Sequence, residues 1–186
     1  MKKKTTCPIS FLVLAVVALL VLAHHHNASH AMSIVAEPTI KLQGLDGRMY
    51  DVAELRGNII LVSFGATWCT PCSTELRALE ELLVEYRDKP VKFFWVSIES
   101  EEDISNSALK RYVKARKVTF PVLRDTAKVA FTQFSLRVRL PVIVFFGKDG
   151  HIDAPVQFGM RSPASTYKLD MRARLNKLLR QPAPDR

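Results

Sequence analysis

The pentapeptide Trp68-Cys69-Thr70-Pro71-Cys72 indicates the fold of this chain because of the segments on either side of it. Residues 59–64, Ile-Ile-Leu-Val-Ser-Phe, form a nearly unbroken apolar run, which predicts a buried strand. Residues 73–87 carry apolar side chains at helical spacing and predict a helix with one face in the core. The spaced positions are Leu76, Leu79, Leu83 and Tyr86. The two cysteines therefore fall where a strand passes into a helix.

The start of a helix changes the chemistry of a thiol. Unpaired N–H groups and the positive end of the peptide dipoles stabilise a thiolate there. We therefore expect Cys69, which precedes or opens the helix, to be partly exposed and to act as the nucleophile. Cys72 lies nearly one turn later on the same side, from which it can attack Cys69 as the resolving cysteine. Pro71 suits the first turn, where its missing N–H is not needed. This arrangement predicts a thioredoxin-like site for thiol–disulfide exchange.

The cysteine content gives no structural disulfide framework. Of the three cysteines, Cys7 lies at the edge of an N-terminal leader, so Cys69 and Cys72 form the only disulfide that we expect. The loop that it closes is too short to give much entropic stabilisation, which indicates a chemical role. Zinc also binds Cys-x-x-Cys, but the folded part has no second such pair and no histidine pair at ligand spacing. We predict no metal and no other cofactor.

Other functions use the same pair of cysteines. A disulfide oxidant or isomerase differs from a reductase in its reduction potential, which cannot be computed from the residues. A non-enzymatic assembly factor would hold Cu(I) on the soft thiolates of Cys69 and Cys72. A peroxidase is less well supported, because the mature chain has no further cysteine. The leading interpretation from the residues is a thiol–disulfide oxidoreductase.

The N-terminus has the pattern of a targeting segment. Lysines at positions 2–4 precede an apolar run at 9–23, which is typical of a signal peptide and short for a membrane span. Small-residue cleavage sites follow Ala23 and Ala31, and an uncleaved membrane anchor through residues 9–23 is the alternative. Residues 1–31 are therefore a signal peptide or anchor plus a His-rich linker. Either version exports the folded part to the periplasm or another extracytoplasmic space, free or anchored to the inner membrane.

Composition limits the classes of partner. The 186 residues carry a formal charge of +9 and are 48% hydrophobic, which fits one globular domain plus a targeting segment. The basic excess gathers in the last helix and the tail, where it indicates a solvated helix face. We predict no nucleic-acid partner, because no stacking aromatic pattern or nucleic-acid motif accompanies the charge. The histidines after the leader are interpreted as a polar linker: His24, His25, His26 and His30.

The folded domain is traced over residues 38–181, with a tail at 182–186. Alternating strands and helices predict an α/β fold with parallel central strands, to which a closing hairpin adds antiparallel strands. The expected strands lie at 39–45, 49–52, 59–64, 91–98, 120–123, 141–147 and 152–158, with a hairpin turn at Asp46-Gly47. Besides the helix after Cys69, the expected helices lie at 103–117, at 125–134 and after Ser162, the N-cap, and Pro163.

Leu140-Pro141 begins one of the predicted strands. A proline there is either a cis peptide beside the site or an ordinary trans proline on an edge strand, and the residues leave both open. A cis bond would leave neighbouring backbone groups free to pair with a substrate segment. The candidate substrate-binding residues are therefore Leu140 and, around the cysteines, Trp68, Thr70 and Pro71.

Several stretches together resemble the TlpA/ResA-type thioredoxin-like proteins, which are exported thiol–disulfide oxidoreductases of bacteria. The resemblance covers about residues 39–179 and is carried by residues 45–48, 55–64, 66–72, 118–125 and 148–150. It implies a thioredoxin-like fold with a central mixed sheet, helices on both faces, an N-terminal β-hairpin and a helical insertion within residues 99–118. It also implies that Pro141 is a cis-proline.

The same resemblance implies function. It points to a reducing role, often in cytochrome c maturation, toward disulfide-containing protein substrates. The electrons would come from a membrane-bound or periplasmic thiol donor. Glu75 stands where the family carries a glutamate near the site, and a half-buried carboxylate there could exchange a proton with Cys72. The alternatives are a solvated helix glutamate and a glutamate that only favours the positive end of the helix. Ser63 occupies the strand position at which thioredoxin has a buried aspartate.

Two departures from the family pattern concern the surroundings of the site. Gly65 stands where the family usually has tryptophan, so we expect an aromatic wall beside the site to be missing. The approach to Leu140-Pro141 is one residue longer than usual and lacks its glycine. In this segment, Arg137 and Arg139 are expected to place positive charge near the site and to lower the pKa of Cys69.

Overall fold

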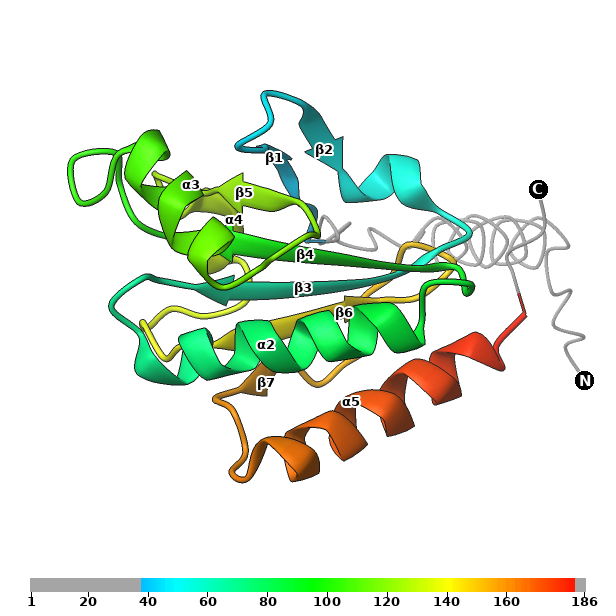
Figure 1. The fold of residues 1–186 in the computed structure, drawn as a ribbon. Helices are drawn as coiled ribbons and strands as arrows, with labels where there is room; N and C mark the ends of the chain where they lie inside the picture. The colour runs from blue at the N-terminus through cyan, green and yellow to red at the C-terminus, as the bar shows by residue number, and fades with distance from the viewer. Residues whose placement is uncertain (1–37, 183–186) are drawn as a thin grey trace, which may run out of the picture. The chain divides into compact units, whose positions relative to one another are not determined.

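A five-stranded mixed sheet lies at the centre of the computed structural model, which describes residues 38–182 (Figure 1). The strand order is β5-β4-β3-β6-β7. Strands β3, β4 and β5 run parallel, whereas β6 is antiparallel to β3 and β7 is antiparallel to β6. The strands are Ile59–Gly65 (β3), Val91–Ser97 (β4), Val122–Arg124 (β5), Val142–Phe146 (β6) and Gln157–Phe158 (β7).

A two-stranded antiparallel hairpin and a 3-10 helix precede the sheet. Their bounds are Lys41–Gln43 (β1), Met49–Asp51 (β2) and Val52–Leu55 (η1). The turn falls at the predicted Asp46-Gly47, where Gly47 has a φ of 85° that residues with a Cβ rarely adopt. The hairpin attaches to the edge strand β5, because the N–H of Leu45 donates to the carbonyl of Val122 at 2.8 Å.

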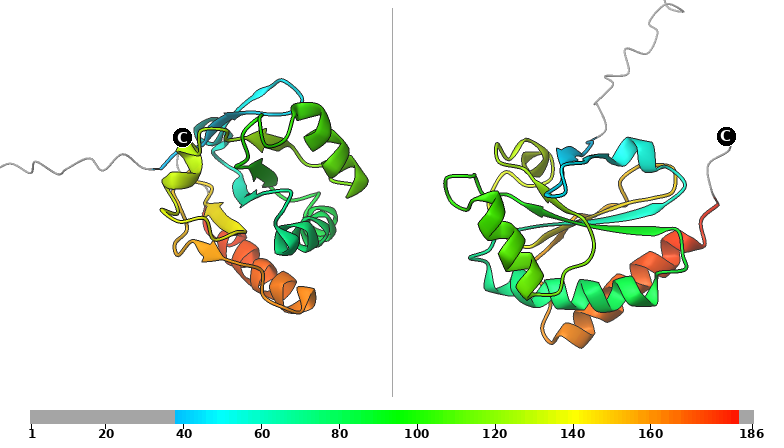
Figure 2. Two further views of the ribbon diagram at one scale, coloured as in Figure 1. Left: turned by 90° about the vertical axis from the view of Figure 1, so that its left-hand side faces the viewer. Right: turned by 45° about the horizontal axis from the view of Figure 1, so that its top comes forward.

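Helices cover both faces of the sheet (Figure 2). They are α2 (Thr70–Glu85), α3 (Asn106–Ala115), α4 (Val129–Thr132) and α5 (Ala164–Leu179). Helices α2, α3 and α5 share one core with Leu61, Phe93 and Trp95 of the strands. The hairpin, η1 and α4 cover the other face, whose core includes Phe64 and Phe131. The predicted α/β architecture is therefore confirmed, and α3 lies in the predicted helical insertion.

Strand β3 is buried on both faces, which explains its apolar run. Ile59 and Leu61 belong to the core beneath α2, while Ile60, Val62 and Phe64 belong to the core beneath the hairpin. A strand covered on both sides has no solvent face and so shows no alternation of polar residues. The predicted strand at 59–64 is confirmed and continues to Gly65.

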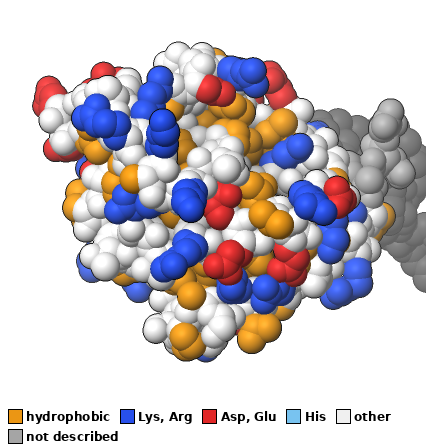
Figure 3. All heavy atoms as spheres, viewed as in Figure 1, with side chains coloured by type: hydrophobic (Ala, Val, Ile, Leu, Met, Phe, Trp, Pro, Cys, Tyr) orange, Lys and Arg blue, Asp and Glu red, His pale blue; other side chains and the backbone are white. Residues whose placement is uncertain are grey.

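Helices α2 and α5 lie side by side on the sheet and are joined by polar contacts. Lys168 pairs with Glu81, and Arg172 pairs with Glu85 at 2.8 Å. Figure 3 shows acidic and basic side chains together over these helices. Such exposed pairs contribute little to stability. Part of the basic excess in the last helix is thus balanced by α2 rather than free in solvent.

Two predicted helix boundaries are wrong for identifiable reasons. The helix expected at 125–134 is a single turn, α4, because Lys128 has a φ of 56° and because the Asp125 carboxylate accepts the N–H of Phe131 at 2.7 Å. The last helix begins at Ala164, and its N-cap is Pro163 rather than Ser162. The ψ of 169° at Pro163 is extended, so this proline lies outside the helix.

Two further details differ from the periodic pattern. Leu83 was expected on the buried face of α2 but is half-buried, whereas Leu82 is fully buried. The buried face is centred between Leu79 and Tyr86, so Leu83 lies at its margin. The strand expected at 152–158 is reduced to β7 and an isolated bridge at Ile152, since Pro155 has no N–H to donate to a ladder.

The predictions for residues 1–31, and for the tail after residue 182, lie outside the described residues. Over residues 38–182, none of the helices has the length and apolar character needed to span a bilayer. The signal peptide, the anchor and the His-rich linker therefore stay predictions.

Candidate active site

Cys69 and Cys72 are joined by a disulfide at the N-terminus of α2. Cys69 is the N-cap of the helix, with an extended ψ of 101°, and its Sγ accepts the N–H of Cys72 at 3.2 Å. Its carbonyl accepts the N–H of Ser73 and so opens the helical ladder. Pro71 lies in the first turn, as predicted, where no intrahelical N–H is required. Cys69 thus lies at the helix terminus, where an N–H group that has no acceptor within the helix can donate to its sulfur.

The two sulfurs are more buried than we expected. Cys69 is 5% exposed rather than partly exposed, and Cys72 is 0% exposed. The reason is that both cysteines pack into the core beneath the hairpin, with Phe64 and Ala66. The neighbouring candidates are open to solvent: Trp68 at 64% exposure, Thr70 and Pro71.

The loop that leads into Cys69 is fastened by Glu99, a residue that the sequence reasoning missed. Its carboxylate accepts the N–H of Thr67 at 2.8 Å and the Thr67 hydroxyl at 2.6 Å. Ser97 donates to the same carboxylate at 3.2 Å, and Glu99 is only 4% exposed. The available signal was an acidic residue two positions after the apolar strand β4, at the end of the sheet where β3 also ends.

Glu75 is fully buried in α2 rather than half-buried. Each of its carboxylate oxygens accepts one hydroxyl: Ser63 donates at 2.7 Å and Tyr167 at 2.6 Å. Burial raises the pKa of Glu75 from 4.5 to about 7, and the two hydrogen bonds oppose that shift because they stabilise the charged form. The solvated alternative is therefore wrong, and the carboxyl group changes charge close to neutral pH.

Tyr167 is the second residue that the sequence reasoning missed as part of the site. It lies in α5, 92 positions after Glu75, and nothing in its own segment marks it as more than a core aromatic. Burial, followed by the charge of Glu75, raises the pKa of the Tyr167 hydroxyl well above its ordinary value. This hydroxyl therefore keeps its proton while Glu75 titrates.

The Leu140-Pro141 peptide bond is cis, so the trans alternative is wrong. Its place follows from the sheet register, in which Phe64 near the end of β3 pairs with Val142 at the start of β6. The proline therefore lies at the end of the sheet where β3 ends and the chain continues to Cys69. Leu140 is half-buried and packs against the core that holds both cysteines.

The volume that a side chain at Gly65 would need is already occupied. A Cβ at Gly65 would lie 2.5 Å from Nε1 and 2.8 Å from Cε2 of Trp95. Trp95 is fully buried in β4 and stacks on Tyr112 of α3. An indole from the neighbouring strand thus occupies the volume, and only glycine fits against it.

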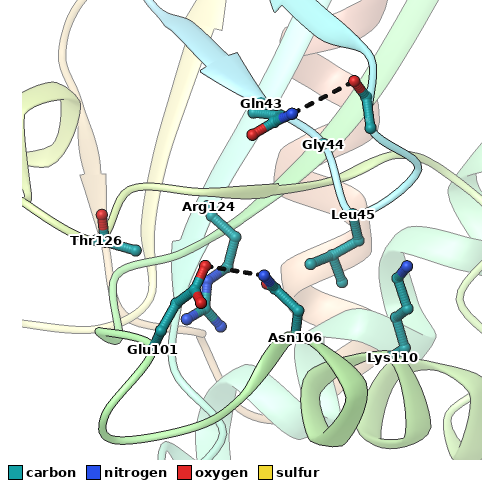
Figure 4. Close-up of a pocket in the computed structure, with 9 residues that line it drawn as sticks. Gln43, Gly44, Leu45, Glu101, Asn106, Lys110, Arg124 and Thr126 are labelled. Atoms are coloured by element: carbon teal, nitrogen blue, oxygen red, sulfur yellow. Dashed lines mark hydrogen bonds between the residues drawn. The ribbon is translucent and has the colours of Figure 1, made fainter.

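A polar pocket of about 360 Å³ lies between the hairpin and α3 and contains neither cysteine (Figure 4). Asn106 donates to Glu101 at 2.8 Å, and Arg124 donates to the carbonyl of Ile104 at 3.0 Å. The first bond lies within the helical insertion, and the second fastens the insertion to β5. Over residues 38–182, no group of three or more His, Cys, Asp or Glu side chains is arranged to hold a metal ion.

A disulfide at the start of the helix that follows the first central strand, on a sheet of this topology, places the protein in the thioredoxin-fold class. Residues 36–154, more than half of the chain, match the AhpC/TSA family. The chain belongs to the AhpC/TSA family.

Curated relatives and solved structures agree with this class. The chain is 28% identical over 115 residues to a "Thiol-disulfide oxidoreductase ResA" of Bacillus cereus, and the match covers 62% of this chain and 64% of that protein. The match thus spans less than two thirds of the relative. A putative thiol:disulfide interchange protein DsbE from Chlorobium tepidum has a TM-score of 0.66 at 17% identity and covers 77% of this chain and 94% of that structure.

A putative protein disulfide isomerase from Bacteroides thetaiotaomicron has the same TM-score of 0.66, at 18% identity, over 78% of this chain and 88% of that structure. At these identities the two structures show the fold. The predicted thioredoxin-like fold, and the predicted likeness to ResA-type proteins, are confirmed.

Proposed function

We propose that this protein is an exported thiol–disulfide oxidoreductase that reduces disulfides in partner proteins. The observation that carries the proposal is the disulfide between Cys69 and Cys72 at the N-terminus of α2, with the N–H of Cys72 directed at the Cys69 sulfur. That N–H and the helix dipole stabilise negative charge on Cys69 once the pair is reduced. The likeness to ResA of Bacillus cereus supports the same class of reaction.

The reaction proceeds in two exchanges. The Cys69 thiolate attacks one sulfur of the partner disulfide, an S–S bond forms to Cys69, and the other partner sulfur leaves as a thiolate. Cys72 loses its proton and attacks Cys69, which restores the internal disulfide and releases the second partner thiolate. Two electrons pass to the partner, and a thiol donor must return them. Cys69 is the attacking residue because it alone of the pair has any exposure.

Glu75 accepts the proton of Cys72 in this scheme. The two residues lie one helical turn apart in α2. A carboxyl group whose pKa is about 7 exchanges protons efficiently at neutral pH. Ser63 and Tyr167 can each donate to the carboxylate or accept from the carboxylic acid, so both charge states of Glu75 have hydrogen-bond partners.

The remaining parts of the proposal rest on sequence. The leader pattern places the protein in the periplasm or another extracytoplasmic space, and residues 9–23 either anchor it or are removed. The donor is a membrane-bound or periplasmic thiol protein. The family resemblance supports cytochrome c maturation or periplasmic redox homeostasis as the pathway, and Trp68, Thr70, Pro71, Leu140 and Pro141 as the residues that meet the substrate.

The reduction potential of the Cys69–Cys72 pair tests the direction of electron flow. Equilibration with a dithiol buffer should give a value near about −270 mV, as for a reductant, whereas about −120 mV would identify a strong oxidant. The variant Cys72→Ser should trap partners as mixed disulfides through Cys69, and Cys69→Ser/Cys72→Ser should trap none. Equal trapping by both variants, or an ordinary free-thiol reactivity of Cys69, would contradict the proposal. Stoichiometric copper that survives dialysis of the reduced protein would instead support the assembly-factor alternative.

A further inference from the structure

The register of the sheet places the segment before Pro141 next to the candidate site. Val142 pairs with Phe64 on one side and with Phe158 of β7 on the other. The N–H of Gly159 donates to the carbonyl of Pro141 at 2.8 Å, so the start of β6 and the end of β7 are fixed together. Residues 136–139, which we name the arginine loop, therefore lie at the same end of the strands as the loop that carries Cys69.

The arginine loop presents apolar side chains to solvent. Leu136 is 93% exposed and Val138 is 50% exposed. Phe158, at 39%, and Trp68, at 64%, add exposed apolar area at the same edge of the sheet. Exposed large apolar side chains that gather beside a reactive group mark an interaction site more often than scattered ones do.

Two arginines alternate with these apolar residues. Arg137 and Arg139 are exposed, and among the described residues neither has a carboxylate within ion-pair distance. Other basic side chains at the protein surface do have such partners, for example Arg172 on α5. The Arg139 guanidinium lies 5.0 Å above the Phe158 ring, which holds it against the end of β7. The loop therefore offers two uncompensated positive charges.

The loop has a defined backbone. The Ser135 hydroxyl donates to the carbonyl of Arg137 at 2.6 Å, and the N–H of Ser135 donates to the carbonyl of Phe131 at 3.1 Å. A surface that is ordered before binding loses less conformational freedom when it binds. The arginine loop alternates basic and apolar side chains, so a partner segment with acidic and apolar side chains complements it.

We propose that the arginine loop selects protein partners whose disulfide is flanked by acidic and apolar residues. This inference rests on the proposed thiol–disulfide exchange and names the class of substrate for it. The acidic side chains of the partner pair with Arg137 and Arg139, and its apolar side chains cover Leu136, Val138 and Phe158. Charge complementarity raises the association rate and rejects basic partners, and salt weakens both effects.

Two disulfide-bonded peptides that differ only in their flanking residues, acidic in one and basic in the other, test the substrate class. At low ionic strength the wild-type protein should reduce the acidic peptide at least about tenfold faster, as kcat/KM, and the preference should shrink as salt is added. Arg137→Glu/Arg139→Glu should abolish or reverse the preference. Arg87→Glu/Lys92→Glu changes the net charge equally, after the end of α2 and near the start of β4, and should keep it.

Two further measurements separate the possible failures. Reduction of bis(2-hydroxyethyl) disulfide, which is uncharged, measures the reactivity of Cys69 itself in each of the three proteins, and the peptide rates are divided by it. The absence of this reaction in the wild type would refute the proposed function. Binding of the same peptides with serine in place of cysteine requires no redox reaction, and equal affinity for both peptides would overturn the substrate class. The substrate class would also be overturned if both charge-reversal variants changed the peptide preference equally. The same holds if the loop variant changed binding to anionic phospholipid vesicles but did not change binding to the peptides.

Discussion

The hydroxyl of Tyr167 in α5 donates a 2.6 Å hydrogen bond to the carboxylate of Glu75 in α2, and both side chains are fully buried. Helix α5 thus supplies part of the environment of the Glu75 carboxyl group, which lies one helical turn from the disulfide. Since the hydroxyl favours the charged carboxylate, whereas burial disfavours it, Tyr167 helps to hold the Glu75 pKa near neutrality.

Tyr167→Phe should raise the pKa of Glu75 further. The variant keeps the ring and removes the donor, so the carboxylate loses one of the two hydrogen bonds that oppose the effect of burial. We expect an upward shift of about one unit, in line with the strength of a hydrogen bond to a charged group. A carbon-13 NMR titration of the Glu75 carboxyl in the oxidised protein measures it.

Tyr86→Phe is the matched control for Tyr167→Phe. The Tyr86 hydroxyl also joins α2 to α5, through a 3.0 Å bond to Asn176, but it does not touch Glu75. This variant should leave the Glu75 midpoint in place. If both variants move the midpoint equally, the shift reflects a general loosening of the α2–α5 contact, and the specific role of Tyr167 is wrong.

Glu75→Gln should stabilise the protein at pH 8 but not at pH 5. The native pKa of about 7 lies above the ordinary value of 4.5, so the native state binds the proton more tightly than the unfolded state does. The wild-type contribution is complete below pH 4.5 and is lost as the pH rises to 7. The loss amounts to roughly 3 kcal/mol, which the neutral glutamine avoids.

Urea unfolding of the oxidised proteins at pH 5 and pH 8 checks this prediction. Glu85→Gln, an exposed pair-forming residue at the end of the same helix, should differ from the wild type by less than about 1 kcal/mol at both values. A stability difference between Glu75→Gln and wild type that stays constant from pH 5 to pH 8 would show that Glu75 titrates normally.

Gly65→Ala should destabilise the protein by about 1–3 kcal/mol, because the added methyl group overlaps the Trp95 indole. The indole has little room to move, since it is fully buried and stacked on Tyr112. Chemical denaturation measures the loss. Adding Trp95→Phe, which removes the crowded part of the ring, should recover part of it, and a lack of any recovery would assign the cost to the backbone at Gly65.

Glu99→Ala should loosen the loop that leads into Cys69. The variant leaves the Thr67 N–H without its 2.8 Å acceptor, and the Thr67 hydroxyl also loses its partner. We expect a loss of about 1–3 kcal/mol in unfolding free energy and faster hydrogen exchange at the Thr67 amide. Glu99→Gln keeps one acceptor oxygen and should fall in between. An unchanged exchange rate at Thr67 in Glu99→Ala would show that another group holds the loop.

Local features of this protein were predictable from the sequence. The buried strand at 59–64, the helix that begins at the cysteines and the turn at Asp46-Gly47 depend on residues close together in the chain. Hydrophobic periodicity, the demands of a helix N-terminus and the backbone freedom of glycine act over a few residues. For that reason the fold class and the disulfide pair could be inferred before the structure was known.

The environment of those cysteines was decided by the tertiary structure. Tyr167 reaches Glu75 from 92 positions away, Glu99 reaches Thr67 from 32, and the Trp95 indole fills the space over Gly65 from another strand. The burial of Cys69 likewise depends on how the hairpin covers the sheet. Such contacts depend on how separate elements pack against one another, and no period or spacing within one segment records that packing.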